Sequence, residues 1–350
     1  MSRVVFPALM MALSALLASC GATLRASSAG TSSSSGPGSS ATSSSVPGSS
    51  ATSSTRATTA TSRPPPASLT PLAAPAALKA FNPGAPATDG VWHAAGRLVA
   101  GHPAVYETTL QPPGSTLEAG VAWMDTNLLS ARLYSGSASP GGGPWKYTAP
   151  ISASAARTLV VAFNGGFKFP ASDGGYYSEG RTVYPLKFGA ASLVIYRNGD
   201  ATVGEWGRDV SMTPDVVAVR QNLTLLVDGG QPVAGLSPAD TSVWGSTLGG
   251  IPNVWRSGVG VTADGALVYV TGPSLTIVQL ADLLVRAGAI RAMTLDMNPD
   301  WTVLATFDPS SATGMATPQN GQNLISGMVQ GPATFFASWW ARDFITMSAR

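Results

Sequence analysis

The stretch SLTIVQLADLLVRAGAIRAMTLDM, residues 274–297, decides the fold that this sequence predicts. Its first part predicts a helix over 274–288, because apolar side chains recur there at helical spacing, at Ile277, Leu280, Ala281 and Leu284. Ser274 is a candidate N-cap, and Gly288 follows where a helix commonly ends. The helix therefore has a start, an end and one apolar face for packing.

The second part, residues 289–297, is almost continuously apolar up to Asp296 and predicts a buried strand. Ahead of the helix, residues 257–272 predict a hairpin that turns at Asp264-Gly265, so a strand also precedes the helix. A strand, a helix and a strand of this length predict a crossover unit, with Asp296 at the carboxyl end of the second strand. Ligands tend to bind at such ends, so the rim around Asp296 is the first candidate for a site.

The remaining apolar segments predict further strands, separated by glycine and proline. They are residues 102–112, 118–136 and 159–169, and a hairpin over 190–206 that turns at Asn198-Gly199. A short helix is predicted over 151–158. The predicted fold class is α+β: a single strand-rich domain with mixed sheets and a few helices, spanning residues 78–350.

Composition excludes some classes of protein. The chain has 350 residues, of which 44% are hydrophobic and 11% are charged, and its formal net charge is +2. Because no basic block is present, nucleic acid is not an expected partner. The 39 glycines and 27 prolines are typical of a turn-rich exported protein rather than of a helical cytosolic one.

The N-terminus has the pattern of an export signal. Residues 1–20, MSRVVFPALMMALSALLASC, combine Arg3 with an apolar run and small residues, and the run is too short to span a membrane. Its end resembles the bacterial lipobox, in which the cysteine is lipidated and becomes the mature N-terminus. Cys20 is the only cysteine of the chain, which favours lipidation over an ordinary signal with an incidental cysteine.

Residues 21–77 predict a disordered tether. Ser, Thr, Ala, Gly and Pro dominate this segment without apolar periodicity, so burial cannot offset the entropy lost on ordering. With Cys20, the tether predicts a domain held by an N-terminal lipid on the extracytoplasmic face of the cell membrane. Secretion is the alternative.

Four segments occur in the order of a known family. They are VVAFNGGFKF (160–169), LTLLVDGG (223–230), WRSGVGVTADGALVYV (255–270) and LTIVQLADLLVRAGAIRAMTLDMNPDW (275–301). This order resembles the phosphodiester glycosidase family, which includes uncovering-enzyme-like N-acetylglucosamine-1-phosphodiester α-N-acetylglucosaminidases and exported bacterial proteins of exopolysaccharide or cell-wall contexts. The resemblance covers residues 158–330 and implies that family's fold.

The resemblance also implies site residues. Those that match the family's motifs are Asn164, Gly165, Gly166 and Phe167, then Asp228, Gly229 and Gly230, and then Arg256. The family usually has L-D-G-G-G-S-S after the helix, whereas this chain has LDMNPDW over residues 295–301. Asp296 is retained and the glycines are lost, as in a divergent, actinobacterial-type branch of the family.

The chemistry of a sugar-1-phosphodiester suggests a role for each candidate. A carboxylate must stabilise an oxocarbenium-like state or activate water, and we assign this role to Asp296, assisted by Asp228. A cation must hold the phosphate, and Arg256 is the candidate. The other candidate substrate-binding residues are Asn164, Gly165, Gly166, Gly229, Asn298 and Trp301.

Each candidate also has a purely structural interpretation. Asp228 can simply make a tight turn, and Asp296 can bond to the amides that follow it. Arg256 can be a partner in a buried ion pair, and Trp301 can belong to the core. The glycines at 165–166 can form a bulge without touching a ligand.

No cofactor is predicted, and a divalent cation stays open. The two histidines, His93 and His102, precede the motif-bearing region, so a histidine zinc site or a Ser-His-Asp triad is not expected there. An all-oxygen calcium site from Asp296, Asn298 and Asp300 is conceivable.

The predicted function is that of an exported, lipid-anchored hydrolase acting on a sugar-1-phosphodiester or a related cell-envelope or extracellular glycan. The expected partners are this carbohydrate or sugar-phosphate substrate and, through the lipid, the membrane. The alternatives are a non-catalytic glycan-binding envelope lipoprotein on the same fold and a purely structural lipoprotein.

Overall fold

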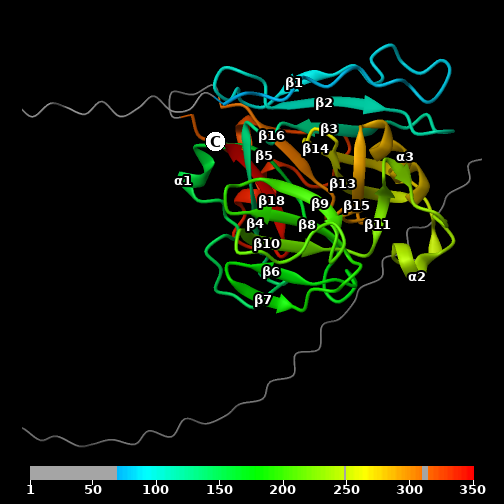
Figure 1. Ribbon diagram of the computed structural model, residues 1–350. Coiled ribbons are helices and arrows are strands. Elements are labelled where there is room, and N and C mark those ends of the chain that lie inside the picture. Colours follow the sequence, from blue (N-terminus) through cyan, green and yellow to red (C-terminus); the bar gives the residue numbers. More distant parts are fainter. Residues whose placement is uncertain (1–68, 248–249, 310–313) are drawn as a thin grey trace, which may run out of the picture. The chain divides into compact units, whose positions relative to one another are not determined.

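A computed structural model describes residues 69–247, 250–309 and 314–350, all within one compact unit that spans Pro65–Arg350 (Figure 1). The expected signal peptide, Cys20 and most of the expected tether lie outside the described residues. Residues 69–77, expected to be tether, are hydrogen-bonded to the folded unit. The Leu72 amide donates to Asp125 Oδ2 at 2.8 Å, and the Asn127 side chain donates to the Thr70 carbonyl at 3.1 Å.

The described strands form three sheets. The eight-stranded sheet has the order β1 (His93–Ala95), β2 (Val105–Leu110), β3 (Ala119–Met124), β14 (Leu267–Leu275), β13 (Val254–Thr262), β15 (Ala289–Thr294), β11 (Leu225–Asp228), β12 (Gln231–Pro232). The second sheet has the order β7 (Arg181–Tyr184), β6 (Tyr176–Ser178), β10 (Val216–Gln221), β8 (Ala191–Tyr196), β9 (Ala201–Glu205). The third has the order β17 (Gly321–Asn323), β16 (Leu304–Phe307), β5 (Leu159–Asn164), β18 (Phe344–Ala349), β4 (Leu129–Tyr134).

The predicted strand-rich α+β class is confirmed, but the expected mixed sheets are wrong, because the sheets are antiparallel. Every ladder between these named strands runs antiparallel, and the parallel pairs among the described residues are isolated bridges. The short helices are α1 (Ala153–Ala156), α2 (Thr241–Trp244) and the 3₁₀ turns η2 (Pro318–Asn320) and η3 (Pro332–Phe336). None of the helices in the described ranges is long and apolar enough to cross a membrane.

Helix α3 (Ile277–Arg286) packs its predicted apolar face against the eight-stranded sheet, beside β13, β14 and β15 (Figure 1). The N-cap is Thr276 rather than the expected Ser274: Thr276 accepts from the Gln279 amide, and the Gln279 side chain accepts in turn from the Thr276 amide. Ser274 still belongs to β14 and cannot cap the helix. Gly288 follows the helix with φ +94°, the left-handed conformation in which glycine is favoured.

The predicted crossover is present, with one strand inserted into it. Strand β13 pairs antiparallel with both β14 and β15, so these two strands run parallel to each other on either side of it. Helix α3 connects them and leaves Asp296 just beyond the carboxyl end of β15. Both predicted hairpin turns also form, with Gly199 at φ +87° and Gly265 at φ +93°.

The three sheets share one apolar core. Tyr269 of the eight-stranded sheet, Leu193 of the second sheet and Met347 of the third lie in the same buried cluster. A second cluster fills the space between α3 and the outer face of the eight-stranded sheet. The inner faces of all three sheets are therefore removed from water together.

A buried ion pair joins the second and third sheets. Arg220 of β10 donates through Nε to Oδ2 of Asp343, the residue before β18, at 2.8 Å, and both side chains are at most 1% exposed. The remaining guanidinium donors reach the carbonyls of Gln221 and Phe167. Because desolvating two charges is costly, such a pair is tolerated only where these additional hydrogen bonds are made.

We expect Asp343→Asn to lower the free energy of unfolding by about 3–5 kcal/mol, because it leaves the buried Arg220 charge uncompensated. The exposed pair between Arg197 and Asp215, 3.9 Å apart with Asp215 77% exposed, supplies the control. Asp215→Asn is expected to change stability by less than about 1 kcal/mol. Urea unfolding of the two variants checks this, and equal losses would show that the buried pair has no special role.

Candidate active site

Asp296 is held at the end of β15 by its own neighbours. Its Oδ1 accepts hydrogen bonds from the amides of Met297, at 2.8 Å, and Asn298, at 3.0 Å. Ser257 of β13 fixes the backbone, because the Ser257 amide donates to the Asp296 carbonyl at 2.7 Å. The turn-forming interpretation of Asp296 therefore holds for Oδ1, and Oδ2 is directed elsewhere.

Oδ2 of Asp296 is bound by Arg342, a residue that the sequence analysis did not select. Arg342 Nη2 donates to this oxygen at 2.6 Å and to the Gly166 carbonyl at 2.8 Å. Its guanidinium lies 4.9 Å from the centre of the Trp301 ring, and its Nε is buried without a hydrogen-bond partner among the described residues. A guanidinium that is only partly satisfied retains donor capacity for an anion.

Asp296 and Arg342 line a cavity of about 700 Å³. Asn298 and Trp301 line one wall of the cavity, and residues 167–171 line another. Its charged lining residues within the described ranges are Lys168, Asp173, Asp296 and Arg342. This volume lies within the range of small-molecule sites.

The environment sets the charge of Asp296. Burial raises the pKa of the Asp296 carboxyl to about 6, although Arg342, the amides of Asn298 and Met297, and Arg220 each lower it. Asp296 is thus ionised at neutral pH and gains a proton in mildly acidic solution. A carboxyl with such a pKa, buried beside a cation in a cavity, is the kind of group on which acid–base chemistry depends.

Asn164 acts behind the cavity wall. At the end of β5, its Oδ1 accepts from the Tyr269 hydroxyl at 2.7 Å and from the Val303 amide at 3.1 Å. Its Nδ2 donates to Ser257 Oγ at 3.1 Å. Asn164 is buried and is not among the described residues that line the cavity, so it ties the third sheet to the strands that carry Asp296.

Gly165 and Gly166 provide space for other side chains. A Cβ at position 165 would overlap the Asp343 carboxylate, and one at position 166 would lie 2.9 Å from Arg220 Cζ. Asn222, also absent from the sequence-based candidates, accepts from the Phe167 amide at 3.0 Å and donates to the carbonyls of residues 294 and 295. These contacts hold the 167–171 wall against the end of β15.

Asp228 lies away from the cavity. It precedes a hairpin turn through Gly229 and Gly230, both with positive φ, and its carboxylate pairs with Arg208 at 2.8 Å. Because β11 runs antiparallel to β15, Asp228 is opposite Arg291. Arg291 precedes Asp296 by five residues, about 17 Å along a strand. The carboxyl ends of two strands meet at one edge only when the strands are parallel, so the structure does not bring the two predicted carboxylates together.

Of the two other predicted binding residues, Trp301 lines the cavity and Arg256 does not. Arg256 is buried, donates to the carbonyls of Leu275 and Pro252, and is not among the described residues that line the cavity. It neighbours Ser257, and successive strand residues face opposite sides of a sheet. Burial lowers the pKa of Arg256 to about 10. Trp301 both packs on Trp340, with ring centres 5.4 Å apart, and lines the cavity.

Two of the oxygens that a calcium site would use accept hydrogen bonds within the turn. Asn298 Oδ1 accepts from the Asp300 amide at 2.8 Å, and Asp296 Oδ1 accepts from the amides of the two residues that follow it, Met297 and Asn298. No group of three or more His, Cys, Asp and Glu side chains that could hold a metal ion occurs within the part of the chain that the structure describes.

The solved structures that this chain is similar to have low sequence identity with it. The catalytic domain of zebrafish N-acetylglucosamine-1-phosphodiester alpha-N-acetylglucosaminidase, auto-inhibited by its pro-peptide, is 15% identical with a TM-score of 0.46, covering 74% of this chain and 87% of that one. A hypothetical protein from Synechocystis is 12% identical with a TM-score of 0.39, covering 71% of this chain and 63% of that one. No curated protein sequence matches the chain.

The family comparison concerns the segment that contains most of the site. Residues 157–323 match the family model described as phosphodiester glycosidase. This range includes Asn164, Asp228, Arg256 and Asp296, and it ends before Arg342. The resemblance predicted from the four motifs is therefore confirmed over residues 157–323: this part of the chain has the sequence pattern of a phosphodiester glycosidase.

Proposed function

We propose that the chain is a glycosidase that hydrolyses a sugar-1-phosphodiester or a related glycan linkage in the cavity around Asp296. One observation carries the proposal: a buried carboxylate and a partly satisfied guanidinium contact each other at 2.6 Å and line the same 700 Å³ cavity. The phosphodiester glycosidase pattern of residues 157–323 supports this class of substrate.

Asp296 and Arg342 match the two parts of such a substrate, the sugar carbon and the phosphate. A phosphodiester oxygen leaves more readily than a sugar hydroxyl, so one well-placed carboxylate can suffice without strong general-acid help. Ionised Asp296 would stabilise positive charge at the sugar carbon or activate water. Arg342 would bind the phosphate through its free donor capacity, and Trp301 would lie against the sugar. Asp228 and Arg256 have no role in this scheme.

We further propose that the domain acts outside the cytoplasmic membrane, held by a lipid on Cys20 and the tether of residues 21–77. The signal-like N-terminus and the single cysteine support this. The proposal fails if the full chain with Cys20→Ser partitions into membranes as the unmodified sequence does.

A second candidate function is binding of a glycan without turnover. It is favoured by the hydrogen bonds of Asp296, because both carboxylate oxygens already accept from protein donors, as in a structural carboxylate. The loop of residues 297–301, which differs from the family's glycine-rich sequence, supplies two of these donors. In this case the cavity binds a sugar phosphate and releases no product.

We expect Asp296→Asn to reduce kcat by about 10²–10⁴-fold on a sugar-1-phosphodiester such as an α-N-acetylglucosamine 1-phosphodiester, because the charge at the reacting carbon is lost. Asp300→Asn, an exposed change in the same loop, is the matched control and is expected to retain wild-type turnover within about threefold. Release of the sugar is the readout. Saturable binding of the probe to the wild-type chain without any release would favour the binding function instead.

The pH dependence gives a separate test. Since the Asp296 pKa is raised to about 6 and the ionised form is the active one, kcat/KM is expected to fall as pH decreases through about 6 and to level off above it. Burial also raises the pKa of Glu107 to about 7, but Glu107 lies on β2 and is absent from the cavity lining. Glu107→Gln should therefore retain the acidic decline. An activity that rises as pH decreases through this range would contradict the assigned role.

A further inference from the structure

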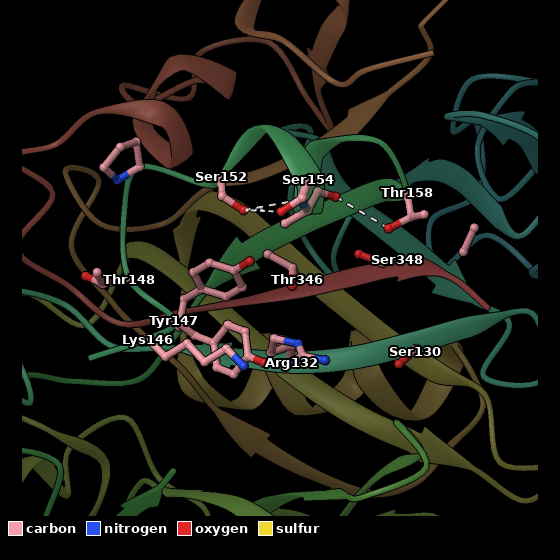
Figure 2. A pocket seen from close by; sticks show the side chains of 14 residues that line it. Ser130, Arg132, Lys146, Tyr147, Thr148, Ser152, Ser154, Thr158, Thr346 and Ser348 are labelled. Atoms are coloured by element: carbon pink, nitrogen blue, oxygen red, sulfur yellow. Dashed lines mark hydrogen bonds between the residues drawn. The ribbon is translucent and has the colours of Figure 1, made fainter. Parts of the chain in front are cut away.

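A second hollow lies on the outer face of the third sheet and is separate from the Asp296 cavity. Its volume is about 600 Å³, and the two share no lining residue. We call it the basic hollow and define it by Ser130, Arg132, Lys146, Tyr147, Thr346 and Ser348 (Figure 2). The phosphodiester glycosidase scheme assigns it no role.

The register of two strands builds the floor of the basic hollow. Strand β4 directs Leu129, Ala131 and Leu133 into the core, so the alternate residues face outward. On this outer face Arg132 pairs with Thr346 of β18, and Ser130 pairs with Ser348. The polar side chains therefore form a continuous row on one side of the sheet.

Residues 146–158 complete the hollow above this floor. Glu179 holds the start of the segment, because its carboxylate accepts from the amides of Lys146 at 2.9 Å and Tyr147 at 2.8 Å. Figure 2 shows Lys146 and Tyr147 beside Arg132, with Ser152, Ser154 and Thr158 beyond the strand that carries Thr346. The position of Lys146 and Tyr147 at the hollow is thus set by the hydrogen bonds of their own backbone to Glu179.

The charge of the basic hollow is one-sided. Arg132 lies 4.0 Å and Lys146 5.2 Å from the centre of the Tyr147 ring, and no carboxylate is among the described lining residues. All 18 acidic residues of the chain fall within the described ranges, and none forms an ion pair with either cation. Two cations that lie beside the same ring without a carboxylate ion-pair partner favour the binding of an anion to the hollow.

The other lining groups select the kind of anion. Hydroxyl side chains line the rest of the hollow, at Ser130, Thr148, Ser152, Ser154, Thr158, Thr346 and Ser348. A hydroxyl both donates and accepts, so it matches the hydroxyls of a sugar ring. We propose that the basic hollow binds a saccharide bearing a phosphate or a carboxylate, with the anion on Arg132 and Lys146 and the ring hydroxyls on the serines and threonines.

In this proposal the hollow binds the sugar, and the reaction takes place at the Asp296 cavity. The protein would then have one site for reaction and another for attachment to an anionic glycan. Linking the two contacts through one polymer raises the effective concentration of substrate at the Asp296 cavity.

Calorimetric titration of the full chain with glucose 6-phosphate, glucuronate and glucose tests the proposal. We expect at least one charged sugar to bind at least tenfold more tightly than glucose, and comparison of the two identifies the anion that is preferred. Arg132→Gln and Lys146→Gln should each weaken that binding about tenfold, because each removes a charge-assisted hydrogen bond. Lys79→Gln removes an exposed positive charge outside the hollow and should leave the affinity unchanged.

Two further measurements locate the binding. In an Asp296→Asn background, Arg132→Gln should still weaken the binding about tenfold, which separates this proposal from the proposed hydrolase function. Hydrogen exchange should show protection within residues 144–158 when the sugar is added. Equal binding of glucose, wild-type affinity in both hollow variants, or protection confined to 166–171 and 296–301 would overturn the proposal.

Discussion

Two adjacent side chains of opposite charge, Arg342 and Asp343, join the three sheets. Asp343 pairs with Arg220 of the second sheet, and Arg342 pairs with Asp296 at the end of a strand of the eight-stranded sheet. Both residues immediately precede β18 of the third sheet. Both pairs are buried, so their desolvation is offset only when the loops around them adopt one arrangement. The same arrangement forms the cavity wall at residues 167–171.

This constraint also explains the properties of Asp296. Asp296 is buried together with Arg342, and this burial raises the pKa of the Asp296 carboxyl to about 6. Arg342 opposes that rise and keeps the carboxylate ionised at neutral pH. A structural ion pair and a reactive carboxylate are therefore compatible here, because the guanidinium has donors beyond those that it gives to Asp296.

The parts predictable from sequence are those set by short-range patterns. Helical spacing and the turn glycines were sufficient for α3, the two hairpins and the position of Asp296 at a strand end. Arg342 and Arg220 could not be found in this way, because their partners are 46 and 123 residues away in the chain. A signal was nonetheless present: Arg342 and Asp343 interrupt the aromatic run FFASWWARDFITM (335–347), where unpaired charges would be very unfavourable. Asp228 was predicted to be in the site but lies outside it. Like Asp296, it ends an apolar strand, but its strand runs antiparallel to β15 and places it at the other end of the sheet.

The most direct test is a crystal structure of the Asp296→Asn variant with an uncleaved sugar-1-phosphodiester. The account predicts that the phosphate oxygens accept hydrogen bonds from the Arg342 guanidinium and that the sugar carbon faces position 296 beside Trp301. A ligand bound away from Arg342, or an Asp296 cavity that stays empty at saturating substrate, would contradict it.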